Sequence, residues 1–196
     1  MRVPCQLLSS QSAKIVAPNP SSSDTGYLAV AGWLQTFGDT GGWDYMDLLN
    51  DNVGSYLHSG AKPCAAVATG DYAIGISFAY AGVKLAGNGS PVEVIFPNEG
   101  LGWEMEATAV VKGAKHLQLG QAVADFSASA AANTLYNNYY QILARKDVAA
   151  TLPDNYPSGE EELLLSPNDF VAVGLKRQAI LTEWEKRYGA KNAPKS

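Results

Sequence analysis

Residues 22–25, Ser-Ser-Asp-Thr, place three hydroxyl groups and one carboxylate where a helix is expected to begin. The first backbone N–H groups of a helix have no partner within it and lie at the positive end of the aligned peptide dipoles. Hydroxyl groups beside such N–H groups form a ready site for phosphate, phosphonate, sulfate or carboxylate. The alternative is that one of these side chains only caps the helix, as Ser, Asp and Thr commonly do. The segment alone favours the cap.

The elements that would position these residues are a strand and a helix joined by a proline-rich turn. Apolar residues predict a buried strand over 14–17, and Pro18 and Pro20 lie in the turn that follows. The spacing of apolar residues predicts a helix over 24–37. Its apolar face carries Tyr27, Leu28, Ala31, Leu34 and Phe37.

Two more polar residues follow predicted strands. Ser59 comes after a short strand at 56–57 and precedes a small-residue helix that ends at Gly70. Tyr80 follows a predicted central strand over 73–78 and opens another helix. The alternation of strands and helices implies an α/β fold, with a mainly parallel sheet and helices on both faces. Ligands of such sheets collect at the carboxyl ends of the strands, where Ser22, Ser59 and Tyr80 are all expected. Tyr80 fits a ligand contact and simple packing equally well.

The remaining elements follow from periodicity and turn residues. Gly41 and Gly42 are expected to break the first helix, and a second helix runs over 43–50. Strands are predicted over 92–96 and 103–111, and helices from Leu117 onwards. Residues 147–165 resemble a surface loop. A last helix is predicted to start at 166–169, with Ser166 as its cap, and a polar, frayed tail is predicted after residue 189.

Composition excludes several classes of function. The net charge of −5 and the pI near 5.0 argue against nucleic-acid binding, which needs clustered Lys and Arg. No apolar run is long enough to predict a transmembrane helix, and the first twelve residues are too short in apolar content for a secretion signal. Cys5 and Cys64 either pair or stay free, and their spacing does not decide which.

Catalytic and metal motifs are absent from the sequence. It has no G-x-S-x-G elbow, Walker loop or dinucleotide fingerprint, and His58 and His116 lack the spacing of metal ligands. Glu104 and Glu106 would share one face of a predicted strand. Such a pair could serve acid-base catalysis, but we favour a structural role. His58 beside Ser59 is interpreted as a strand-end residue. We therefore expect no enzyme, no metal and no cofactor.

Four segments together resemble a known family. They are K-I-V-A-P-N-P-S-S-S-D-T-G-Y-L at 14–28, H-S-G-A-K-P-C at 58–64, A-I-G-I-S-F-A-Y at 73–80 and F-P-N-E-G-L-G-W-E-M-E at 96–106. This chain is similar to the periplasmic, or extracellular, solute-binding proteins of ABC importers, in the branch for ferric iron and 2-aminoethylphosphonate. The resemblance covers nearly the whole chain and implies the type II fold. In that fold, two α/β lobes joined by crossing strands close on a ligand held between helix N-termini.

The resemblance also implies the ligand-binding residues Ser22, Ser23, Thr25, Ser59 and Tyr80. The paired tyrosines of iron-binding members are replaced by Tyr80 alone, which favours an organophosphonate over direct Fe(III) coordination. Asp24 stands where the family pattern has glycine, and its carboxylate would repel a dianion unless it points to solvent. The implied partners are a small phosphonate-like anion and an importer permease. The implied location is periplasmic or extracellular, with the cytoplasm as the alternative because no export signal is visible.

The segments match one lobe better than a whole binding protein. Residues 13–105 with 166–189 resemble the second lobe, and 106–145 resemble elements that would pack on a first lobe. Residues 146–165 are then a surface loop, and 1–12 and 190–196 are tails. The resemblance therefore implies a truncated binding protein with half a ligand site.

Half a site is expected to bind weakly. A charge-assisted hydrogen bond contributes about 1.5–3 kcal/mol, whereas association costs at least ~4 kcal/mol. Three or four exposed contacts then leave an affinity near millimolar. The alternative is a self-associating interaction module without ligand binding, in which residues 106–145 form a dimer by burying Leu119, Val123 and Phe126.

Overall fold

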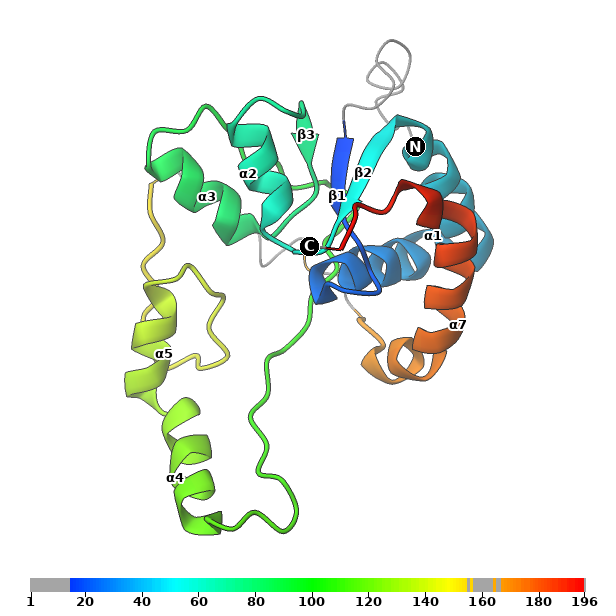
Figure 1. Cartoon of the computed structure of the whole chain (residues 1–196). Coiled ribbons are helices and arrows are strands. Elements are labelled where there is room, and N and C mark those ends of the chain that lie inside the picture. The colour runs from blue at the N-terminus through cyan, green and yellow to red at the C-terminus, as the bar shows by residue number, and fades with distance from the viewer. Residues whose placement is uncertain (1–14, 155, 157–163, 165–166, 196) are drawn as a thin grey trace. The chain divides into compact units, whose positions relative to one another are not determined.

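The computed structural model describes residues 15–154, 156, 164 and 167–195 (Figure 1). The chain divides into two compact units. Unit 1 comprises residues 1–104 and 157–196, and unit 2 comprises residues 105–156. Unit 1 contains the sheet and the predicted site residues, so it is described first.

A three-stranded parallel sheet forms the centre of unit 1, in the order β2-β1-β3. The strands are β1 (Ile15–Pro18), β2 (Val53–Leu57) and β3 (Ile74–Gly75). All four residues of β1 are buried, as expected for a strand paired on both sides. The predicted α/β class with a parallel sheet is confirmed. The central strand is β1, however, and the segment predicted as central contributes only the two residues of β3 at the edge.

Helices pack on the sheet from both sides (Figure 1). The helices α1 (Asp24–Asn52) and α7 (Phe170–Tyr188) contact each other beside β1 and β2. On the other side, α2 (Lys62–Ala68) contacts β1, β3 and α3 (Ala79–Gly87). The helix α7 is capped by Asp169, whose carboxylate accepts a hydrogen bond from the amide of Ala172 at 2.8 Å. The predicted cap Ser166 lies outside the described residues.

A sharp break divides α1, but not at the predicted position. The backbone of Gly38 has φ of 75°, which the predicted pair Gly41–Gly42 does not share. Gly42 instead lets the two segments of α1 approach, because a Cβ there would lie 2.9 Å from the Cα of Leu34. The rings of Trp33 and Tyr45 lie 5.4 Å apart across the same bend. The glycine pair therefore provides close packing, and Gly38 provides the turn.

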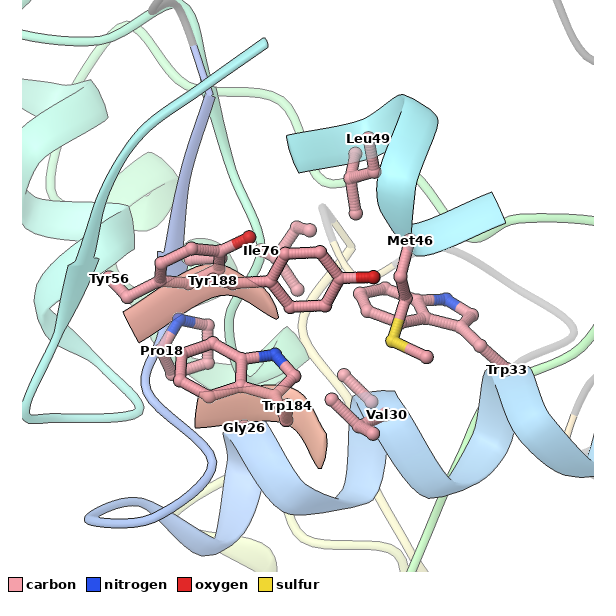
Figure 2. A pocket seen from close by; sticks show the side chains of 12 residues that line it. Pro18, Gly26, Val30, Trp33, Met46, Leu49, Tyr56, Ile76, Trp184 and Tyr188 are labelled. Carbon is pink, nitrogen blue, oxygen red and sulfur yellow. The ribbon is translucent and has the colours of Figure 1, made fainter. Parts of the chain in front are cut away.

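The core of unit 1 lies between the sheet, α1 and α7 (Figure 2). Trp184 is 2% exposed, and its ring meets those of Tyr56 and Tyr188 at centroid distances of 4.8 and 5.8 Å. A cavity of about 10 Å³ remains among these aromatic side chains and those of α1. This volume holds at most about one water molecule, so the cavity is a packing void.

Two predicted strands are wrong. Residues 92–96 and 103–111 are all described, and none of them forms a strand. Val94 packs against Gly82 of α3, where a Cβ would lie 2.7 Å from the Val94 side chain. The ring of Trp103 lies 5.1 Å from that of Phe170 on α7, and the carbonyl of Trp103 accepts a hydrogen bond from Asn168 at 2.7 Å. Val94 and Trp103 thus contact helices rather than a neighbouring strand.

The polypeptide after α7 is held by contacts with β2, so the prediction of a frayed tail is wrong for residues 190–193. The short 3-10 helix η1 (Gly189–Lys191) follows α7, and Asn192 forms a bridge beside Tyr56. The amide of Ala193 then donates to the Tyr56 carbonyl at 2.9 Å. The ammonium of Lys191 binds two carbonyls at the end of α1, those of Asn50 and Val53.

Unit 2 contains α4 (Leu117–Ser127) and α5 (Ala130–Asn137). Ser129 caps α5 by accepting a hydrogen bond from the Ala132 amide at 3.1 Å. No residue of α4 is buried.

Among the described helices, none is both long enough and apolar enough to span a bilayer.

Candidate functional site

The turn between β1 and α1 is organised by Asn19, which is 2% exposed. Its side-chain oxygen accepts a hydrogen bond from the amide of Ser21 at 2.7 Å, and its side-chain NH₂ donates to Asn192 at 2.8 Å. Its own amide donates to the Leu57 carbonyl at 2.8 Å. A single buried asparagine therefore ties the turn to β2 through its backbone amide and to the C-terminal tail through its side chain.

The first turn of α1 presents amide groups that precede any hydrogen bond within the helix. The first such bond runs from the amide of Tyr27 to the carbonyl of Ser23 at 3.1 Å, so the amides of Asp24, Thr25 and Gly26 come before it. Ser23 is the N-cap residue, yet its side chain makes no capping hydrogen bond in the described chain. The alternative of a simple serine cap therefore does not hold at Ser23. Asp24 is exposed to solvent.

Thr25 has the most unusual environment at this helix end. It is 8% exposed, and its Oγ1 has no hydrogen-bond partner among the residues that the structure describes. Gly60 lies against it, because a Cβ at Gly60 would overlap this Oγ1 and would come within 2.7 Å of the Phe78 ring. A buried hydroxyl without a partner costs about 1–3 kcal/mol.

Ser22 is paired with His58 across the edge of the sheet. Its Oγ lies 2.6 Å from Nδ1 of His58, which follows β2 directly. The opposite ring nitrogen, Nε2, lies 2.9 Å from the carbonyl oxygen of Ala193. The histidine therefore connects the hydroxyl-rich turn to the C-terminal tail.

Ser59 and Tyr80 lie at the same edge but in different environments. The Oγ of Ser59 accepts long hydrogen bonds, 3.4 Å each, from the amides of Ala61 and Lys62 at the start of α2. Tyr80 is half-buried, and its ring lies 5.3 Å from that of Phe78. Ser59 thus accepts from amides at the start of α2, and Tyr80 packs on Phe78, an aromatic neighbour of Thr25.

The sheet brings most of the predicted residues to its carboxyl edge, as parallel strands should. The turn residues Ser22 and Thr25 contact the segment after β2, and Phe78 links that segment to Tyr80. Sequence reasoning missed Asn19, His58 and Gly60. The Asn19–Pro20 dipeptide is a turn signal that could have indicated the structural role of Asn19. No residue near His58 or Gly60 in the sequence shows that Ser22 and Thr25 will face them.

The described residues offer no cluster of side chains suited to metal binding. No group of three or more His, Cys, Asp or Glu side chains gathers at the site or elsewhere in the described chain. Glu104 and Glu106 share no strand face, because the predicted strand does not form. Burial raises the pKa of the Cys64 thiol, and a hydrogen bond with Ser77 opposes this shift. The thiol therefore stays protonated near neutral pH. Cys5 lies outside the described residues.

Comparisons with known proteins agree with this architecture. A family model for bacterial extracellular solute-binding proteins matches residues 12–169. An uncharacterized protein of Haemophilus influenzae is 28% identical over 173 residues, which are 85% of this chain and 49% of that protein. The periplasmic binding protein AfuA from Actinobacillus pleuropneumoniae, solved with fructose-6-phosphate bound, matches with a TM-score of 0.76 at 23% identity. That match covers 95% of this chain and 63% of AfuA.

The chain thus spans about half the length of the curated relative that it matches. The match to AfuA shows that the fold is that of part of a periplasmic binding protein. The family match includes the β1–α1 turn, the segment after β2 and all of unit 2, and its members bind solutes rather than catalyse reactions. On this match, the chain belongs to the bacterial extracellular solute-binding proteins.

Proposed function

We propose that the carboxyl edge of the sheet in unit 1 binds the phosphate or phosphonate group of a small organic anion. The observation that carries the proposal is the Thr25 hydroxyl, which is buried at the N-terminus of a long helix and has no hydrogen-bond partner in the described part of the chain. Amides before the first bond of the helix and an unpaired hydroxyl together supply donors for an oxyanion. The exposed carboxylate of Asp24 can remain in solvent while the anion binds.

The ligand class follows from the donors at the site and the relatives of the chain. Ser22, Ser23 and Thr25 each carry a hydroxyl that can donate one hydrogen bond to a tetrahedral oxyanion. Ser59 and Tyr80 are proposed to contact its organic part. AfuA was solved with a sugar phosphate, and the sequence resembles binders of 2-aminoethylphosphonate. The chemistry that these ligands share is a phosphorus oxyanion on a small polar skeleton.

In this proposal the protein works outside the cytoplasm as the binding component of an ABC importer. Unit 1 supplies one side of the ligand site, with an affinity near millimolar by itself. Micromolar capture requires about 8 kcal/mol of binding free energy, which needs a second surface that excludes water from the anion. A permease is the proposed protein partner.

Replacing Thr25 with valine separates ligand binding from folding. The variant removes a buried, unpaired hydroxyl at constant shape, so the free protein should gain about 1 kcal/mol of stability. Anion affinity should fall about tenfold, because one hydrogen bond to the charged ligand is lost. Urea unfolding gives the first quantity. Calorimetric titration with phosphate, 2-aminoethylphosphonate and fructose-6-phosphate gives the second and ranks the ligands.

The matched control is Thr182→Val on α7, where the exposed hydroxyl donates to the Gln178 carbonyl at 2.9 Å. Its anion affinity should equal that of the unmodified protein. Amide chemical shifts of residues 22–25 provide a direct reading of the site. If these amides do not respond to any of the three anions at high millimolar concentration, the proposed anion site is wrong.

We further propose that unit 2 pairs with a second copy of the chain through one face of α4. Leu119, Val123 and Phe126 lie at helical spacing on that face and are 67%, 62% and 54% exposed. Fully burying such a side chain is worth about 1.5–3 kcal/mol. The alternative function, a self-associating module, rests on this observation.

Sedimentation velocity should therefore show a dimer whose population rises with protein concentration. Phe126→Glu should shift the protein to monomer, because the dimer would bury an unpaired carboxylate. Gln121→Glu places the same charge on the opposite side of α4 and should leave the dimer intact. A monomer at every concentration, before any substitution, would count against the pairing.

A further inference from the structure

We propose that His58 controls the direction of the Ser22 hydroxyl hydrogen, so that unit 1 takes up a proton when it binds an oxyanion. The inference rests on the proposed function, because Ser22 is one of the anion donors in that proposal. It adds His58, whose role is to determine whether the Ser22 hydroxyl donates a hydrogen bond to the ligand or only presents lone pairs to it.

The two neighbours of the imidazole fix its neutral form. A carbonyl oxygen only accepts hydrogen bonds, so the 2.9 Å contact with Ala193 requires a hydrogen on Nε2 of His58. A neutral imidazole carries one hydrogen, and Nδ1 is then an acceptor. The 2.6 Å contact therefore has the Ser22 hydroxyl donating to Nδ1. In this state the only hydrogen on Ser22 Oγ points at the histidine, and the oxygen presents lone pairs to an incoming anion.

Protonation of His58 reverses the bond. With hydrogens on both ring nitrogens, Nδ1 donates to Ser22 Oγ, and Nε2 keeps its bond to Ala193. The Ser22 hydrogen is released and can donate to an oxyanion. The imidazolium also contributes a positive charge one hydrogen bond away from the ligand. Oxyanion binding and protonation of His58 therefore favour each other, and affinity should rise as the pH falls.

The elements around His58 also carry charged groups. They are Asp24 on α1, Lys62 on α2, Glu185 on α7, and Lys191 and Lys195 after α7. Imidazole is the side chain that ordinarily changes charge between pH 5 and pH 8. The second histidine, His116, belongs to unit 2 and precedes α4. It serves as the control.

The test uses sulfate, which stays a dianion across this range, unlike phosphate. Calorimetry should show sulfate binding about tenfold tighter at about pH 5.5 than at about pH 8, because a coupling of one pKa unit is a factor of ten in affinity. Repeating the titration near neutral pH in buffers of different ionisation enthalpy should reveal net proton uptake. Nitrogen-15 shifts of the ligand-free protein at high pH should identify the His58 tautomer with hydrogen on Nε2.

Three substitutions separate this mechanism from its rivals. His58→Gln should remove the pH dependence, whereas His116→Gln should keep it. Ser22→Ala should also remove most of the dependence, because the histidine acts through the serine hydroxyl. If Ser22→Ala keeps the full dependence, His58 acts directly as a charge and the proposed control of Ser22 is wrong. A neutral tautomer with its hydrogen on Nδ1 would equally contradict that control.

Failure of this inference differs from failure of the proposed function. Equal sulfate affinity at both pH values would overturn the role of His58 and leave the anion site standing. Absence of binding by sulfate, phosphate and 2-aminoethylphosphonate at both pH values would overturn the anion site and the proton linkage together.

Discussion

Trp184→Ala is expected to lower the free energy of unfolding by about 3–5 kcal/mol, the range for removing a buried large aromatic side chain. The indole is 2% exposed and makes edge contacts with the rings of Tyr56 and Tyr188. The indole borders the cavity shown in Figure 2, so its removal would enlarge an existing void. The surrounding side chains do not fill that cavity now, and we expect them to fill the larger one only in part. Urea unfolding followed by far-UV circular dichroism measures the change.

Leu175→Ala is the matched control for this truncation. Leu175 lies on the same helix and is 83% exposed, so its removal should change stability by less than about 0.5 kcal/mol. A Trp184→Ala effect as small as that of the control would show that α7 does not complete the core of unit 1.

Gly26→Ala is expected to destabilise unit 1 by about 3 kcal/mol, the upper end of the range for overpacking. An added Cβ would lie 2.6 Å from the carbonyl oxygen of Pro18 and 2.8 Å from backbone atoms of Asn19 and Pro20. These are backbone atoms of the β1–α1 turn, so no side chain can rotate away. The helix must move off the turn, and that displacement should also abolish anion binding at its first amides.

The control for this substitution lies in the same helix. A Cβ at Gly41 would meet only the Cβ of Phe37, at an ordinary distance of 3.5 Å. Gly41→Ala should therefore stabilise the protein by about 0.5–1 kcal/mol through helix propensity. Changes of the same sign at the two glycines would contradict close packing of α1 on the turn. Urea unfolding and phosphate titration of both variants make the comparison.

Together these predictions connect the fold to the proposed function. The Asn19 turn, Gly26 and the tail at Asn192 hold the start of α1 at the carboxyl edge of the sheet. The same arrangement buries Thr25 without a partner among the described residues. In the proposed function, the stability given up at Thr25 is recovered when an oxyanion binds there.

Local sequence signals predicted most elements of unit 1. Turn residues and apolar spacing indicated β1, β2, α2, α3 and α7 and placed the hydroxyl residues at the start of α1. The same signals failed for 92–96 and 103–111, because a run of β-formers becomes a strand only where another strand pairs with it. Here Val94 and Trp103 pack on helices instead. The sequence predicted the break in α1 at Gly41–Gly42, but it lies at Gly38. Whether a glycine makes a turn or allows close packing depends on which residues face it, and the sequence does not show those neighbours.

The sequence by itself therefore determined the class of fold, the family resemblance and the hydroxyl residues of the candidate site. These properties depend on neighbours along the chain, through helix and strand periodicity and turn chemistry. Only the tertiary structure decided that Ser22 faces His58, that Gly60 covers Thr25 and that Ala193 fixes the imidazole. Those contacts join residues 35 to 135 positions apart in the sequence. Residues so far apart come into contact only when the parallel strands bring their ends together.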